Sequence, residues 1–318
     1  MTIALGHKNP KKSGGASRRH FSLGLVNLTL LYILNRLDFA AKSRRLEIEK
    51  IAICFVIEIH QLLAMSHVIA FFNQSGGVGK TTVTQNIGYQ LSTKGHRVLL
   101  LDMDPQASLT TFMGVDVAQL DKTIYDALVS ETDEPLAILH NLYDMDLSPA
   151  NIVLANAEQE LVLADQRELR LKLPLSQVLD NYDFVLIDCP PSLGILSQIS
   201  LVAATEIIVP IQTQFKALMG TDFLLSTVKK VQRRLNKDLK IAGFIPTMFS
   251  AANALDQRTL ETIVEQLSPI AQVFSPIPRA TAIAEASEYG KPLAISPKKN
   301  SAILTIFEEI AKAIEKLE

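Results

Sequence analysis

The chain has 318 residues, of which 48% are hydrophobic and 20% are charged, which is typical of a folded protein with enough chain for a large core. Its two cysteines, Cys54 and Cys189, lack metal-ligand spacing, which argues against a disulfide framework and agrees with a reducing cytoplasm. Residues 1–64 hold 10 Lys and Arg against 4 Asp and Glu, a net charge of +6, so the total of −2 leaves −8 for residues 65–318. We therefore analyse residues 1–64 and residues 65–318 separately.

Residues 1–64 are an extension that we exclude from the fold argument. A basic stretch, 7–20, precedes an apolar run, 21–34, in the outline of a signal peptide. No small-residue cleavage site follows that run, and it is too short for a comfortable membrane span. Met65 stands directly before a clean first strand. We therefore expect a native start at Met65, one domain over 65–318, and a poorly ordered or non-native extension over 1–64.

From Met65 onward, short apolar runs alternate with segments of helical spacing. The apolar runs predict buried strands over 67–73, 97–104, 145–150, 183–192, 206–214 and 240–249. The helical patterns predict helices over 81–95, 122–130, 166–182, 217–235, 255–267 and 300–317. Repeated strand–helix units predict an α/β fold with a single doubly wound, mostly parallel sheet that carries helices on both faces.

The segment FFNQSGGVGKTT, residues 71–82, predicts a loop that grips phosphate. It follows a strand and precedes a helix, so backbone N–H groups freed by its glycines and the positive end of the helix dipole converge on one place. Lys80 is expected to reach the β- and γ-phosphates, and the Thr81 hydroxyl to bind Mg²⁺. The expected nucleotide-binding residues are Gly76, Gly77, Val78, Gly79, Lys80, Thr81 and Thr82. The consensus G-x-x-x-x-G-K-[ST] wants glycine at position 74, where this chain has Gln74.

Two further strand ends carry carboxylates at the edge where open parallel sheets bind their ligands. Asp188 closes an apolar strand, as a Walker B acid does, and is expected to hold Mg²⁺ directly or through water. Asp102 and Asp104 lie two residues apart and share a strand face, so one can assist Mg²⁺ while the other orients the attacking water. We assign Thr81, Asp102 and Asp188 to the metal, and Lys80 and Asp104 to catalysis. No N-K-x-D motif occurs at NKDL, 236–239, which favours ATP over GTP.

Five segments in order resemble the ParA/MinD family of deviant Walker ATPases, and most closely its ParA side: NQSGGVGKTT, LLLDMDPQASLT, DFVLIDCPPSLG, IIVPIQTQFKALMG and IPRATAIAEASEYGKPL. The resemblance covers nearly all of residues 66–318. It implies a Mg²⁺-dependent ATPase of the cytoplasm and nucleoid that forms an ATP-sandwich homodimer and separates after hydrolysis. It also implies that Asp104 positions water and Asp188 is the Walker B acid. The family's adenine contacts map to Thr247, Met248 and Pro278.

The chain departs from the family pattern at Ser75, where most ParA proteins carry a signature lysine that crosses the dimer interface. Loss of that cation among several negative charges should lower dimerisation or turnover unless another cation replaces it. We expect Lys216 to do so, with Arg279 and Arg258 as alternatives. The missing lysine resembles the carboxysome-positioning branch, McdA, of cyanobacteria. We therefore expect carboxysome positioning with a small McdB-like adaptor, and plasmid or chromosome partition with a ParB-like adaptor is the alternative.

Positive charge is concentrated around the predicted helix 217–235. Its buried stripe is expected at Leu224, Leu225, Val228, Val231 and Leu235. The basic residues fall largely outside this stripe, in a region that is acidic overall, which favours contact with a phosphate backbone and gives no sign of base readout. We predict sequence-independent DNA binding through Lys229, Lys230, Arg233, Arg234 and Lys237.

Two other functions are less consistent with the sequence. A MinD-like membrane switch needs a basic amphipathic tail, but the polar face of 301–318 carries four glutamates and two lysines, which suits packing on the sheet. We therefore predict no membrane binding. An iron–sulfur reductase of the nitrogenase type needs two cluster cysteines downstream of the phosphate loop, where Cys189 stands alone.

Overall fold

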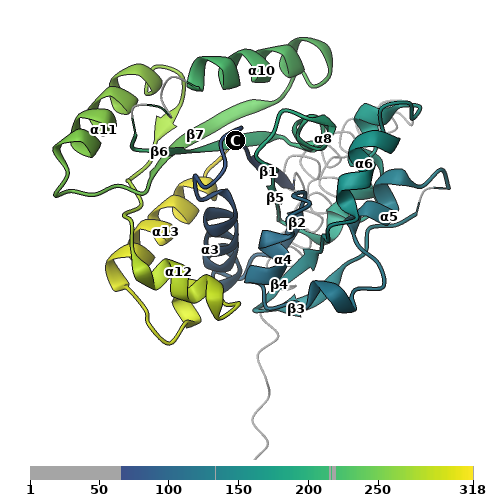
Figure 1. The fold of residues 1–318 in the computed structure, drawn as a ribbon, viewed down its shortest axis with the longest axis horizontal. Coiled ribbons are helices and arrows are strands. Elements are labelled where there is room, and N and C mark those ends of the chain that lie inside the picture. The colour runs from purple at the N-terminus through teal and green to yellow at the C-terminus, as the bar shows by residue number, and fades with distance from the viewer. Residues whose placement is uncertain (1–65, 133, 215, 217–219, 318) are drawn as a thin grey trace, which may run out of the picture. The chain divides into compact units, whose positions relative to one another are not determined.

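A mostly parallel sheet organises the chain (Figure 1). The computed structural model describes residues 66–132, 134–214, 216 and 220–317, which belong to one compact unit, Ser66–Glu318. In sheet order the eight strands are β3 (Leu139–Leu142), β4 (Met145–Ser148), β2 (Val98–Asp102), β5 (Phe184–Asp188), β1 (His67–Phe71), β6 (Glu206–Gln212), β7 (Lys240–Thr247) and β8 (Gln272–Val273). All neighbours pair in parallel except β3 with β4. The predicted fold is therefore confirmed.

Helices cover both faces of the sheet, in two apolar layers. One layer contains α3 (Lys80–Thr93), α4 (Ser108–Phe112), α12 (Thr281–Glu288) and α13 (Ser301–Ile314). The other contains α5 (Ile124–Val129), α6 (Leu154–Glu160), α7 (Lys172–Ser176), α8 (Ile195–Ala203), α10 (Thr221–Arg234) and α11 (Ala254–Leu267). The sheet is thus a buried middle layer, and its loops are left to carry function.

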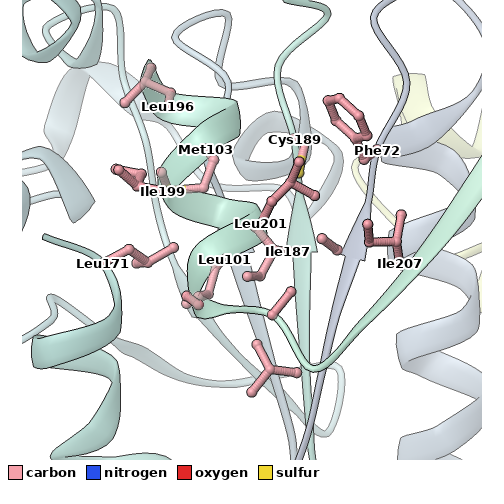
Figure 2. Packing of buried hydrophobic residues seen from close by; sticks show 14 of the residues in the cluster. Phe72, Leu101, Met103, Leu171, Ile187, Cys189, Leu196, Ile199, Leu201 and Ile207 are labelled. Carbon is pink, nitrogen blue, oxygen red and sulfur yellow. The ribbon is translucent and has the colours of Figure 1, made fainter. Parts of the chain in front are cut away.

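Alternation along the central strands produces these two layers. Val68 and Ala70 of β1 face one layer, and Ile69 and Phe71 face the other, because successive side chains of a strand point to opposite faces. Figure 2 shows the layer that contains α8, where strand residues such as Ile187 pack toward the turns of that helix. Burial on both sides fixes β1 and β5 rigidly, and these two strands present the phosphate loop and the predicted Walker B acid.

The helix that follows the phosphate loop packs closely on the sheet at Gly88. A Cβ atom at this position would lie 2.9 Å from Leu100 Cδ2 and 3.1 Å from Met145 Sδ. Contacts that short would force the neighbouring side chains to move, so glycine allows α3 to approach the sheet. The N-terminus of α3 is thereby held beside the carboxyl ends of β1 and β5.

Most predicted elements are confirmed, and one is wrong. Residues 166–182 do not form one helix: two short 3₁₀ turns, Arg167–Leu169 and Leu179–Asn181, flank α7. Pro174 stands in the first turn of α7, the position where its missing N–H would have no partner in any case. The sequence patterns did not predict β3, β8, α4, α6, α8 and α12. The C-terminal helix packs its apolar face on the sheet, as expected, burying Phe307 and Ile310 among others.

Residues 1–64 lie outside the described residues, so the predicted boundary before residue 65 stays a prediction. Among the residues that the structure does describe, no helix is both long enough and apolar enough to cross a bilayer.

Candidate nucleotide-binding site

The predicted phosphate loop, residues 72–79, connects β1 to α3 at the carboxyl edge of the sheet. Gly77 and Gly79 have φ angles of +69° and +88°, a left-handed conformation that glycine adopts without strain. Gly79 is the N-cap of α3 and provides no side-chain cap. N–H groups in the first turn of α3 are therefore available to an anion, which is the usual arrangement of a phosphate site.

Side chains from neighbouring strands hold the carbonyl groups of this loop. Gln212, the last residue of β6, donates a hydrogen bond of 2.9 Å to the Gly77 carbonyl, and the Thr247 hydroxyl donates one of 2.8 Å to the Val78 carbonyl. Gln74, which replaces the consensus glycine, donates to a backbone carbonyl at the start of α10, at 3.1 Å. These long-range anchors were not predicted from the sequence. They hold the loop in place, and the Gly77 and Val78 carbonyl groups already accept hydrogen bonds.

Lys80 lies buried at the start of α3, where it is 6% exposed. Its Nζ donates a 3.0 Å hydrogen bond to the Ser75 carbonyl on the opposite side of the loop. Burial lowers the pKa of Lys80, while the acidic groups around it in their charged forms, Asp188 first and then Cys189 and Asp104, act in the opposite direction. The lysine is therefore a desolvated cation over the loop, where an anionic ligand would stabilise its charge.

Asp188 ends β5, between β1 and β2, and its register partners are Phe71 and Asp102. Both carboxylate oxygens are buried and accept no hydrogen bond of ordinary geometry within the described residues, although the Thr81 hydroxyl lies close enough to favour the charged form. Burial raises the pKa of Asp188 well above its usual range, and the Asp102 charge raises it further, against the opposing Thr81 hydroxyl and Lys80. An unpartnered buried carboxylate is costly unless a ligand satisfies it, and carboxylate oxygens are preferred ligands of Mg²⁺. Its chemistry therefore fits a cation site.

Asp102, the register partner of Asp188 on β2, is also buried, but its carboxylate already accepts hydrogen bonds. Its Oδ2 accepts hydrogen bonds from the Thr110 N–H at 2.8 Å and hydroxyl at 2.7 Å, and its Oδ1 accepts one from the Asp104 N–H at 3.2 Å. The Thr110 hydroxyl in turn accepts from the Ala150 N–H at 2.9 Å. Burial raises the pKa of Asp102 to about 6 despite these donors. Asp102 thus connects β2, α4 and the end of β4, and its assignment as a metal ligand stays a prediction.

The remaining predicted residues of the loop and strand ends lie around this edge. Thr81 and Thr82 are half-buried in the first turn of α3, and Gly76 is exposed. The Val78 side chain belongs to the buried core, so only its backbone is available to a ligand. Asp104 is half-buried and accepts a hydrogen bond of 2.9 Å from the backbone N–H two residues on.

A cavity of about 440 Å³ opens beside Gly79 and Thr82, and its lining is largely apolar. All three predicted adenine contacts line it: Thr247, Met248 and Pro278. They come together because the chain after β7 pairs with residues 277–279, through a bridge between Phe249 and Pro278. Residues that the sequence did not single out complete the wall, among them Phe112, Ile283 and Ala284. The volume and lining suit a nucleobase with its sugar.

Within one chain, no hydrogen bond or ion pair joins the expected substitute for the signature lysine to the loop residues that the structure describes. Ser75 is half-buried and offers its carbonyl to Lys80. Lys216 is exposed and makes no hydrogen bond or ion pair within the described residues. Arg258 is exposed on α11, whereas Arg279 lines the nucleoside cavity. The replacement by Lys216 therefore stays a prediction that concerns a second copy of the chain.

The helix α10 displays its predicted basic residues. Its inner face buries Leu224, Val228 and Val231, while Leu225 is half-buried and Leu235 is 38% exposed. All five predicted DNA contacts are exposed, and none makes a hydrogen bond or ion pair within the part of the chain that the structure describes: Lys229, Lys230, Arg233, Arg234 and Lys237. These cations are therefore available to a partner.

Comparison with known proteins places this site in a family. A family model described as an AAA domain matches residues 66–241. The sporulation initiation inhibitor protein Soj of Bacillus subtilis is 39% identical, covering 79% of this chain and 98% of that protein. The chromosome-partitioning ATPase Soj of Treponema pallidum is 38% identical, covering 79% of this chain and 97% of its own length.

Solved structures agree with this relationship. Cobyrinic acid a,c-diamide synthase from Mycobacterium smegmatis, with bound ATP analogue and magnesium, matches with a TM-score of 0.69 and 34% identity, covering 79% of this chain and 95% of that one. Apo McdA of Cyanothece matches with a TM-score of 0.70 and 24% identity, over 79% and 100% of the two chains, and shows the shared fold alone. The chain belongs to the ParA/MinD family of P-loop ATPases.

Proposed function

We propose that this chain is a Mg²⁺-dependent ATPase of the ParA type, whose ATP-bound form is a homodimer that binds DNA without sequence preference. The observation that carries the proposal is the Asp188 carboxylate, which is buried near Lys80 and Thr81 and accepts no hydrogen bond of ordinary geometry in the described part of the chain. A group in this state needs a cation or a donor, and the adjacent phosphate loop makes Mg²⁺ with a nucleotide the ligand that fits best.

Each residue of the site has a separate role in the proposed phosphoryl transfer. Lys80 binds the β- and γ-phosphates, and loop N–H groups with Thr81 and Thr82 complete the phosphate contacts. Thr81 and Asp188 hold Mg²⁺, which neutralises charge on the phosphates when it is bound, and Asp102 supports this edge. Asp104 orients the attacking water. The assignment of the metal and nucleotide is supported by the relatives whose structures contain an ATP analogue or ADP with magnesium.

The adenine and ribose occupy the cavity beside Gly79. Its lining by Thr247, Met248 and Pro278 supports the base contacts implied by the family. Thr247 also holds the Val78 carbonyl, so base binding and loop position share one side chain.

Dimerisation completes the site from a second copy of the chain. Ser75 supplies no cation, so a partner residue must offset the phosphate charge, and we assign this role to Lys216 of the partner subunit. Lys216→Ala should reduce dimerisation in the presence of Mg²⁺ and a non-hydrolysable ATP analogue, as measured by light scattering. Lys291→Ala, which removes an equally exposed lysine elsewhere, is the matched control. Equal dimerisation of both variants would remove Lys216 from the site.

The cargo is the finer part of the proposal. Relatives with chromosome-partitioning names are 36–38% identical to this chain, which favours partition with a ParB-like adaptor that stimulates hydrolysis on the nucleoid. Carboxysome positioning with an McdB-like adaptor is the second candidate, and Ser75 in place of the signature lysine is the observation that favours it.

Nucleotide binding to Asp188→Asn tests the site directly. This nearly isosteric change removes the charge needed for Mg²⁺, so the affinity for a fluorescent ATP analogue should fall when Mg²⁺ is present and change little when it is chelated. The variant should also melt at a higher temperature than the ligand-free parent, because it removes an unpaired buried carboxylate. Asp238→Asn, at an exposed position, is the control. Identical Mg²⁺-dependent affinities in parent and variant would refute the assignment.

A further inference from the structure

A second large groove lies away from the nucleotide site, between α5, α6 and residues 161–174. Its volume is about 730 Å³, which exceeds that of the nucleoside cavity. Its walls come from the end of α5, the end of α6 and the first turns of α7. None of the residues assigned above to nucleotide, metal or DNA lines it.

The charge of this groove is acidic. Among the described residues, four carboxylates line it, against one cation, Arg170. Glu131 and Asp165 are exposed and have no side-chain partner within the described residues, whereas Glu134 pairs with Lys122 and Glu160 accepts hydrogen bonds from a tyrosine. The guanidinium of Arg170 donates to backbone carbonyls of Ser130 and Asp165 on the two rims. Arg170 therefore connects the two rims of the groove, and the carboxylates make its net charge negative.

Apolar side chains stand beside these carboxylates. Leu163 is 91% exposed and Leu173 is 46% exposed, and both line the groove. Its floor includes the buried residues Ala127 and Leu161. Burying such an exposed leucine against a partner removes apolar surface from water and is therefore favourable. An exposed apolar patch of this kind, rimmed by charge, marks an interaction surface.

We propose that this groove binds a basic segment of a partner protein, which packs an apolar side chain on Leu163 and Leu173 and places Lys or Arg beside Glu131 and Asp165. The sign of the charge selects this occupant: carboxylates repel DNA and anionic lipid, and attract a cationic peptide. The apolar rim adds a contact that a free cation would not use.

The groove is connected to both strand-end carboxylates through the segment that contains α6. Glu158 of α6 lies against Gly194, since a Cβ on that glycine would be 2.7 Å from Glu158 Oε1, and Gly194 opens α8 a few residues after Asp188. Before α6, the Ala150 N–H donates to Thr110, which donates to Asp102. A segment bound in the groove can therefore shift the edge where ATP is hydrolysed. This coupling rests on the proposed function, whereas binding to the groove does not.

A pair of synthetic peptides tests the groove without nucleotide. The full chain is titrated with fluorescein-labelled LKKLLKKLLKKL or with its acidic counterpart LEELLEELLEEL, and anisotropy is read at low and moderate salt. We expect saturable binding of the basic peptide alone. Combining Leu163→Ser with Glu131→Lys and Asp165→Lys should weaken it at least tenfold; all three sites are exposed, so the fold is not at risk.

The matched control is Glu261→Lys with Glu265→Lys, an equal change of charge on exposed positions of α11. If this control weakens binding as much as the groove variant does, or if the acidic peptide binds equally well, the proposal is overturned. ATP turnover with and without the basic peptide tests the coupling: a change that disappears in the groove variant supports it, and unchanged turnover refutes it. A chain that binds the peptide but no ATP would refute the proposed function and leave the groove standing.

Discussion

Replacing Lys229 and Arg233 together by alanine removes two exposed cations of α10. The two residues lie one helical turn apart, on the side away from buried Leu224 and Val228. Both are exposed and make no ion pair within the described residues, so their loss breaks no internal contact. The substitution therefore changes the surface charge and leaves the fold intact.

The expected magnitude follows from counterion release. If each of the two cations contacts one phosphate, the ATP-bound dimer loses four contacts. The slope of log K against log salt should then become shallower by about 3.6, at about 0.9 per contact on duplex DNA. At 0.15 M salt the same loss corresponds to about a 10³-fold weaker affinity, which would nearly abolish nonspecific binding.

The assay is fluorescence anisotropy with two labelled duplexes of unrelated sequence, in Mg²⁺ and a non-hydrolysable ATP analogue, over a series of salt concentrations. The control, Lys291→Ala with Lys299→Ala, makes the same change in net charge at exposed positions away from α10. Both duplexes should respond alike. An unchanged salt slope in the α10 variant, or an equal loss in the control, would refute the assignment of this helix to DNA.

Two changes probe the framework around the site. Thr110→Val keeps the shape of a buried residue but removes the hydroxyl that serves Asp102 and a backbone N–H, so it should lower the free energy of unfolding by about 2–4 kcal/mol in urea titrations. Thr111→Val, next to it on the surface, should change it far less, and equal effects would contradict this account. Burial acts to raise the pKa of Glu315, but Lys94 and a histidine together outweigh it and hold that pKa below its usual range. The stabilisation by that pair is present above the unfolded pKa of glutamate and is lost as the pH falls through the lower folded value. Glu315→Gln should therefore cost about 1 kcal/mol near pH 7 and progressively less as the pH falls below the unfolded pKa of glutamate, and a constant difference in thermal melts would contradict the ion pair.

The parts of the fold that the sequence predicts are those encoded locally. The phosphate loop is predictable because glycines, lysine and threonines follow one another at fixed spacing between a strand and a helix. The central strands are predictable because burial on both faces makes them continuous apolar runs. β3 was missed because it is an edge strand with exposed residues in its centre, and α12 was missed because it buries Ala286 and little else, so neither has a clear apolar period.

The sequence predicts the types of residue in the site, but not which of their side chains have hydrogen-bond partners. Asp102 and Asp188 both close buried strands, yet Asp102 accepts two hydrogen bonds from Thr110, whereas Asp188 accepts none of ordinary geometry within the described residues. This difference depends on how α4, which contains Thr110, packs against the strand ends. No local sequence pattern predicts that packing. The same holds for the side chains of Gln212 and Thr247, which hold the loop from strands more than a hundred residues away.

The mass of the full chain in solution tests the central claim, that ATP joins two copies of this protein. Light scattering after gel filtration should give twice the chain mass of 35.0 kDa when Mg²⁺ and a non-hydrolysable ATP analogue are saturating, and the single mass with ADP. A mass of 35.0 kDa with the analogue demonstrably bound would contradict the account.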